Sequence, residues 1–84
     1  MNIHVKIFPI AGLCNQSQDL ELALENGSLD ELLVRIQKRL DTDTDLRKTE
    51  TLMFLYNGRV LDKHKDVVLS DGGELWLLPL LSGG

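Results

Sequence analysis

The sequence predicts a small α+β domain in which one helix packs across one face of a sheet of four to five strands. Three observations predict this fold class. Apolar and polar residues alternate in several short stretches, one longer stretch repeats apolar residues at helical spacing, and glycine-containing turn signals separate the stretches. The 84 residues are 43% hydrophobic, which is sufficient for the thin core of a single domain over residues 1–84.

Two strands are predicted at the amino-terminal end. Residues 3–10 begin with strict alternation, and Pro9 ends this strand or places that part at a sheet edge. Residues 11–19 read as a polar loop, and residues 20–25 place leucine at alternate positions. Two half-buried strands joined by one loop predict an antiparallel hairpin.

A helix is predicted after the Asn26-Gly27 turn. Ser28 and Glu31 have the spacing of a capping box, in which each side chain accepts a hydrogen bond from the other residue's amide. Acidic residues in the first turn and basic residues in the last turn suit the helix dipole. The apolar stripe that we expect to face the core consists of Leu29, Leu32, Leu33, Ile36 and Leu40.

A second hairpin is predicted in the middle of the chain. Residues 51–56 form a strand, Asn57-Gly58 is the strongest short hairpin signal, and residues 59–61 return as a short strand. The last strand begins at Glu74. The element order is therefore strand, strand, helix, strand, short strand, strand.

The remaining segments are predicted connections. Residues 41–50 are polar and acidic and read as a solvated loop. The acidic residues from Asp41 to Asp45 could bind calcium, but they lack the calcium-loop pattern with its central glycine and its glutamate at the last position. Residues 62–66 form a charged connector, residues 67–69 pack at its far end, and residues 70–73 form a turn.

The last strand is apolar on both of its faces. Leu75 and Leu77 have one parity, and Trp76, Leu78 and Leu80 have the other. Because one helix covers only one face of the sheet, the second set predicts an exposed apolar stripe that binds a partner. The alternative is a strand buried on both faces.

The sequence ends in Leu81-Ser82-Gly83-Gly84. We expect residues 81–84 to form a flexible tail, because glycine has no Cβ and allows the backbone to approach another surface closely. Our hypothesis is that the terminal carboxylate of Gly84 is the reactive group. Gly83 and Ser82 would then be small spacers, and Leu80 and Leu81 would hold the base of the tail against a partner.

Composition argues against several classes of function. A net charge of −4 disfavours nucleic acid and anionic membranes as partners. A lone Cys14, together with the absence of a signal peptide or membrane-length apolar run, suggests a reducing, cytoplasmic compartment. Cys14, His4 and His64 have no spacing of a zinc site or a nucleophile–base pair, so we expect no metal and no catalysis by this chain, and the role of Cys14 is left open.

Three segments resemble the β-grasp sulfur carriers, namely the molybdopterin synthase small subunit (MoaD) and its thiamine-pathway relative ThiS. These segments are residues 57–61, residues 69–75 and residues 79–84. The element order is also that of ubiquitin, and the resemblance extends over the whole chain. Its helix of ordinary length and long first loop are more similar to MoaD. Two departures are Pro79-Leu80 in place of Pro-Pro and Gly73 in the acidic position of the turn.

The resemblance implies a β-grasp fold with a mixed sheet and parallel first and last strands at its centre. It also implies that an E1-like adenylating enzyme (MoeB/ThiF type) uses ATP and magnesium to convert the Gly84 carboxylate to an acyl-adenylate and then a thiocarboxylate. This chain would bind no cofactor itself, since it lacks a P-loop motif. The second partner would be the molybdopterin synthase large subunit or, for a ThiS-like carrier, thiazole synthase. A ubiquitin-like modifier joined to lysine through Gly84 is the other alternative.

Overall fold

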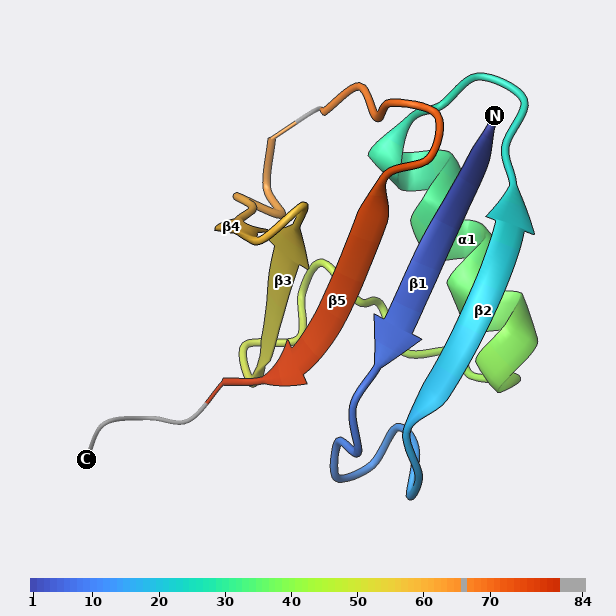
Figure 1. Cartoon of the computed structure of the whole chain (residues 1–84). Coiled ribbons are helices and arrows are strands. Elements are labelled where there is room, and N and C mark those ends of the chain that lie inside the picture. The colour runs from blue at the N-terminus through green and yellow to red at the C-terminus, as the bar shows by residue number, and fades with distance from the viewer. Residues whose placement is uncertain (66, 81–84) are drawn as a thin grey trace.

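The computed structural model of the chain describes residues 1–65 and 67–80. These residues form one helix and a five-stranded sheet with the strand order β2-β1-β5-β3-β4 (Figure 1). The elements are β1 (Asn2–Ile7), β2 (Gln18–Ala23), α1 (Leu29–Leu40), β3 (Leu52–Tyr56), β4 (Arg59–Val60) and β5 (Glu74–Pro79).

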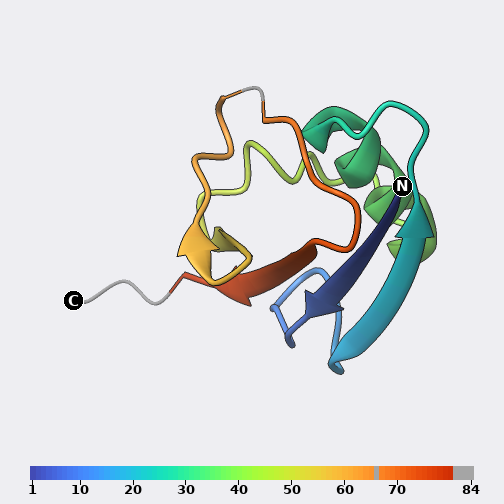
Figure 2. The same cartoon turned by 45° about the horizontal axis from the view of Figure 1, so that its top comes forward.

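The first and last strands lie side by side near the centre of the sheet. β1 pairs with β5 in parallel, from His4 opposite Glu74 to Ile7 opposite Leu77. β2 pairs with the outer side of β1, and β3 with the other side of β5, both antiparallel. Helix α1 lies on one side of this sheet, and the view in Figure 2 separates the two layers. The mixed sheet with a parallel central pair is confirmed.

The core lies between α1 and one face of the sheet. Alternation along each strand directs every second side chain to this face. Leu75 and Leu77, which were predicted to face the helix, are both 0% exposed. The other buried apolar side chains of the strands and the helix are Ile3, Val5, Ile7, Leu22, Leu29, Leu32, Leu33, Ile36, Leu52 and Phe54.

Four predicted strands differ in their bounds from the structure: those expected over residues 51–56 and 59–61 are Leu52–Tyr56 and Arg59–Val60, and the two amino-terminal strands differ more. The strand expected over residues 3–10 ends at Ile7, ahead of Pro9, and Ile10 instead forms an isolated bridge with Cys14. The strand expected over residues 20–25 begins at Gln18, because the whole of β1 from Asn2 onward needs an antiparallel partner.

Two connections also pack differently from expectation. The loop over residues 41–50 is not wholly solvated, since Leu46 turns back into the core and is 1% exposed. Residues 67–69 do not all pack inward. Val68 is 84% exposed because it forms a bridge with Ser28, which leaves Leu69 on the buried side.

The turn before β5 explains the glycine at position 73. A Cβ on Gly73 would lie 2.8 Å from Cε1 of Tyr56, closer than real Cβ contacts come. The tyrosine ring is itself held in place, because its hydroxyl accepts a hydrogen bond of 2.8 Å from the amide of Ser70. The acidic residue that related carriers often have at this position would therefore not fit beneath Tyr56.

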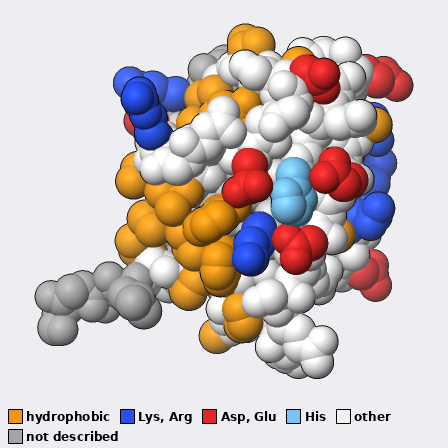
Figure 3. Space-filling model, in the orientation of Figure 1, with side chains coloured by type: hydrophobic (Ala, Val, Ile, Leu, Met, Phe, Trp, Pro, Cys, Tyr) orange, Lys and Arg blue, Asp and Glu red, His pale blue; other side chains and the backbone are white. Residues whose placement is uncertain are grey.

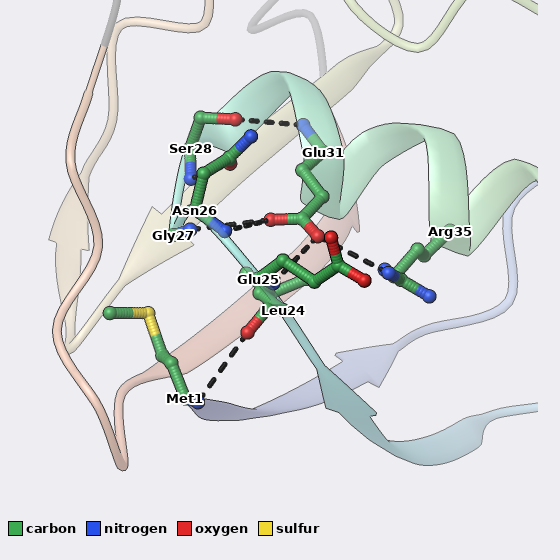
Figure 4. A network of polar contacts seen from close by, with 8 residues as sticks. All are labelled: Met1, Leu24, Glu25, Asn26, Gly27, Ser28, Glu31 and Arg35. Carbon is green, nitrogen blue, oxygen red and sulfur yellow. Dashed lines mark hydrogen bonds and ion pairs between the residues drawn. The ribbon is translucent and has the colours of Figure 1, made fainter.

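The amino-terminal cap of α1 is only half of the expected capping box (Figure 4). The Ser28 hydroxyl accepts a hydrogen bond of 3.1 Å from the amide of Glu31, as predicted. The second predicted bond, from the Ser28 amide to the Glu31 carboxylate, does not form. The Ser28 amide donates instead to the Asn26 side chain at 3.1 Å. The Glu31 carboxylate accepts instead from the amides of Glu25, Asn26 and Gly27.

These contacts lower the pKa of the Glu31 carboxyl below its ordinary value of 4.5. The hydrogen bond from the Glu25 amide contributes most; desolvation opposes it, and the amides of Asn26 and Gly27 and the Arg35 guanidinium add to the lowering. Because folding lowers this pKa, the charged carboxylate stabilises the fold above its unfolded-state pKa. That stabilisation is lost as the pH falls through the folded-state pKa.

Glu31→Gln is therefore expected to be less stable than the wild type at pH 7, and the difference should shrink as the pH is lowered to about 3. Urea unfolding followed by circular dichroism at a series of pH values measures this difference. Glu25→Gln is the matched control, because it removes a nearby carboxylate and keeps the amide that Glu31 uses. A constant difference between wild type and Glu31→Gln over the whole pH range would contradict the assignment.

Candidate functional site

The face of the sheet opposite α1 carries an apolar surface over β5, β3 and β4. The register of the strands creates it: Trp76 lies opposite Leu55, Leu78 opposite Met53, and Leu55 also opposite Val60 on β4. These residues alternate with the buried set, so their side chains point away from the helix. We call this surface the apolar face; its members are Phe8, Met53, Leu55, Val60, Trp76, Leu78 and Leu80.

The apolar face is exposed to solvent and continuous. Val60 is 73% exposed and Leu80 is 48% exposed, while Trp76 and Leu78 are half-buried. In Figure 3, hydrophobic side chains gather over β5 and β3 on the side where β5 ends. Contiguous exposed apolar surface of this kind marks interaction sites on globular proteins.

Three of the residues predicted to bind a partner, Trp76, Leu78 and Leu80, lie on this face. The fourth, Leu81, and the predicted tail Ser82, Gly83 and Gly84 lie outside the described residues. The partner-binding role of all of these residues stays a prediction. Four further residues of the apolar face were not predicted from the sequence, namely Phe8, Met53, Leu55 and Val60. The alternation in residues 52–56 was a signal for Met53 and Leu55.

A groove of about 610 Å³ opens beside the apolar face. It shares Met53, Val60 and Leu80 with that face, and its other wall comes from the loop before β3 and the connector after β4. Arg47 and Lys63 join these two segments, since Arg47 donates to the Lys63 carbonyl at 2.7 Å and Lys63 donates to the Leu52 carbonyl at 3.0 Å. The apolar face therefore borders a groove beside Leu80, and the hydrogen bonds of Arg47 and Lys63 hold the other wall of this groove together.

The other half of the open face, over β1 and β2, is charged. His4 and Lys6 of β1 lie opposite Glu21 and Asp19 of β2, and Glu74 of β5 lies on the other side of His4. Figure 3 shows this division between a hydrophobic area and a group of acidic, basic and histidine side chains. The open face thus combines an apolar half over β5, β3 and β4 with a polar half over β1 and β2.

The described residues do not bring the chemically reactive side chains together. Cys14 is half-buried in the loop after β1, and its Sγ contacts the carbonyl of Phe8 at 3.4 Å. Within residues 1–65 and 67–80, no group of three or more His, Cys, Asp or Glu side chains could hold a metal ion. No helix in that part of the chain is long and apolar enough to cross a membrane.

A mixed sheet with a central pair of parallel strands and one helix across one face defines a ubiquitin-like β-grasp fold. The model of the ThiS family matches residues 5–84. The chain therefore belongs to the ThiS family, and it is a β-grasp protein of the ThiS/MoaD sulfur-carrier type. No curated protein sequence matches the chain.

Three solved structures share this fold over the whole chain. A chain in the complex of subunits 1 and 2 of the molybdopterin-converting factor from Helicobacter pylori has a TM-score of 0.60 at 20% identity, with 100% of both chains covered. The solution structure of the HVO 2177 protein from Haloferax volcanii has a TM-score of 0.64 at 18% identity, covering 100% of this chain and 87% of that one. SAMP1 from the same organism has a TM-score of 0.56 at 20% identity, with 100% of both chains covered.

Proposed function

We propose that this chain carries sulfur on the carboxyl group of Gly84 and delivers it in the biosynthesis of molybdopterin. The observation that carries the proposal is the position of the apolar face. It is built around β5, which ends at Pro79, and the sequence continues through Leu80 and Leu81 to Ser82-Gly83-Gly84. A partner that docks on this face would therefore hold the residues that precede the tail in the sequence.

The chemistry begins with the weakness of a carboxylate as an electrophile. An adenylating enzyme of the E1-like type supplies ATP and magnesium, and the Gly84 carboxylate attacks the α-phosphorus with release of pyrophosphate. Hydrosulfide then attacks the acyl carbon and displaces AMP, so that a C–S bond replaces the C–O bond to AMP and a thiocarboxylate results. The contribution of this chain is to present the end of its tail, since glycine carries no side chain that would obstruct a narrow channel.

Two docking events are needed, one with the adenylating enzyme and one with the sulfur acceptor. The acceptor we favour is the molybdopterin synthase large subunit, because a fold neighbour of this chain occurs in a complex of two subunits of the molybdopterin-converting factor. The resemblance to MoaD in the length of the 12-residue helix and of the loop over residues 8–17 supports the same choice. A thiazole synthase is the alternative acceptor, favoured by the match to the ThiS family.

The test is the intact mass of the chain after co-expression with its adenylating enzyme. We expect a species heavier than the unmodified chain by the difference between one sulfur and one oxygen atom. Purified thiocarboxylate is then mixed with either acceptor, and we expect sulfur to pass to the molybdopterin precursor with the large subunit and not to thiazole with thiazole synthase.

Other results would redirect the proposal. Transfer with thiazole synthase alone would assign the chain to thiamine synthesis. Conjugates of the chain on the lysines of other proteins, with no thiocarboxylate, would make it a protein modifier. An unmodified mass in the presence of an active adenylating enzyme would overturn the carrier chemistry.

A further inference from the structure

Trp76, at the centre of the apolar face, has a defined set of contacts within the chain. Its indole N–H donates to the carboxylate of Glu74, two residues earlier on the same strand. The Phe8 ring lies 5.5 Å away between centroids, at an interplanar angle of 58°, and the Lys6 ammonium lies 5.6 Å from the indole ring. The polar end of this aromatic side chain is therefore satisfied without a partner, and its ring packs beside Lys6 of β1 and Phe8, which follows β1.

The same Glu74 carboxylate also contacts His4. Nδ1 of His4 lies 3.3 Å from Oε2 of Glu74, and Nε2 of His4 lies 3.1 Å from Oδ1 of Asp19. A neutral imidazole has one N–H and one acceptor nitrogen, whereas an imidazolium donates from both nitrogens. Because carboxylate oxygens lie against both nitrogens, both contacts are hydrogen bonds only when both nitrogens carry a proton.

The other charges that face His4 come from its own strand and from β2. Lys6 is two residues along β1 on the same face, and Glu21 lies directly opposite His4 on β2. The side chains of His4, Asp19 and Glu74 are 36%, 62% and 43% exposed, so the contacts are partly screened by water.

We propose that Glu74 is a positioning residue for docking and that protonated His4 neutralises it. Glu74 satisfies the indole N–H, so Trp76 can enter an apolar pocket whose walls offer no hydrogen-bond acceptor. Burial of the N–H without an acceptor would cost free energy, and so would an uncompensated carboxylate at the rim of that pocket. The partner surface that fits is therefore an apolar pocket for Trp76 with no cation of its own required opposite Glu74.

This inference rests on the proposed docking of the open face, and it makes docking depend on pH. A neutral His4 leaves one of its two carboxylate contacts without a donor, so affinity should be weaker at pH 8 than at pH 6. His64 lines the groove beside the apolar face, and its contribution is common to wild type and His4→Gln.

The free protein provides the first test, because Trp76 is the only tryptophan of the sequence. Its single indole N–H resonance, observed by NMR with ¹⁵N labelling, should shift as the pH is raised from 5 to 8. The titration should disappear in His4→Gln and in Glu74→Ala. Glu21→Gln is the matched control, which removes another carboxylate beside His4 and should retain the titration.

The second test is affinity for the molybdopterin synthase large subunit at pH 6 and pH 8. Wild type and Glu21→Gln should each bind about two- to fivefold more weakly at pH 8 than at pH 6, after division by the change that His4→Gln shows between the same two pH values. The change shown by His4→Gln measures the effect of pH on the other groups of both proteins. Glu74→Ala should bind more weakly than wild type at pH 6, and its affinity should not respond to His4→Gln in the double variant.

The outcomes separate the two proposals. An indole resonance that titrates equally in wild type and His4→Gln, or a pH response of docking that survives His4→Gln unchanged, would overturn the role of His4 and Glu74. Failure of wild type to bind any of its proposed partners would instead overturn the proposed function, while the resonance titration would still decide whether His4 and Glu74 control Trp76.

Discussion

Leu77→Ala is expected to lower the free energy of unfolding by about 3 kcal/mol, whereas the same change at the next residue, Leu78→Ala, should lower it by less than about 1 kcal/mol. Leu77 is 0% exposed and lies opposite Phe54 in the core, so its truncation leaves a cavity. Leu78 is half-buried on the open face opposite Met53, where water fills the space left by the side chain. Urea unfolding followed by circular dichroism measures both values.

The order should reverse for docking. Leu78→Ala is expected to weaken binding of the large subunit at least tenfold, which corresponds to about 1.4 kcal/mol, because truncation of an interface side chain loses buried apolar contact. Leu77→Ala should bind within about threefold of wild type under conditions in which it remains folded. Equal losses of stability in the two variants would mean that β5 is buried on both faces, and equal affinities would remove Leu78 from the docking surface.

The division of β5 into two faces was predictable because alternation in a strand has a fixed period and the sequence contains a single amphipathic helix. One helix leaves one side of a sheet uncovered, so one parity of residues 75–80 had to be exposed. The same argument applies to β3, where Met53 and Leu55 have the opposite parity to Phe54. The Asn57-Gly58 turn then fixes the register that brings Val60 opposite Leu55, and the extent of the apolar face follows from it.

The contacts of His4 could not be predicted in this way. They join three strands, and they depend on which residue of β5 lies beside which residue of β1. A parallel pair has no turn that sets its register, since the strands are at opposite ends of the chain. The neighbourhood of Glu74, His4 and Asp19 therefore appears only when the tertiary structure is known.

Local sequence motifs predicted some contacts only in part, because those contacts also depend on the path of the chain in the folded structure. The spacing of Ser28 and Glu31 identified the start of α1 correctly, but the return bond went to the preceding turn because the Asn26 side chain occupies the Ser28 amide. Leu46 is a single apolar residue in a polar segment and has no periodicity. Its burial depends on how the loop after α1 returns to the sheet, which the sequence pattern does not contain.

Deletion of Gly84 is expected to abolish sulfur transfer while docking stays within about threefold of wild type. The deletion leaves a carboxylate on Gly83, so the loss does not come from the absence of the functional group. The loss comes from the shorter tail, because one residue of extended chain spans about 3.3 to 3.6 Å at most and its removal withdraws the terminal carboxylate by up to that distance. Reacting atoms must approach within about 3 to 3.5 Å, and a misplacement of about 1 Å already costs on the order of a hundredfold in rate.

Ser82→Ala is the matched control for this deletion, since it changes the same tail but keeps its length and a small side chain. It should retain both docking and transfer. The adenylation step is measured by pyrophosphate release and the transfer step by thiocarboxylate mass, with affinity for each partner recorded in parallel. Transfer by the shortened chain at the wild-type rate would show that the terminal carboxylate of Gly84 is not the reactive group. A shortened chain that loses docking as well would mean that Gly84 contributes to partner binding and that the apolar face alone does not hold the complex.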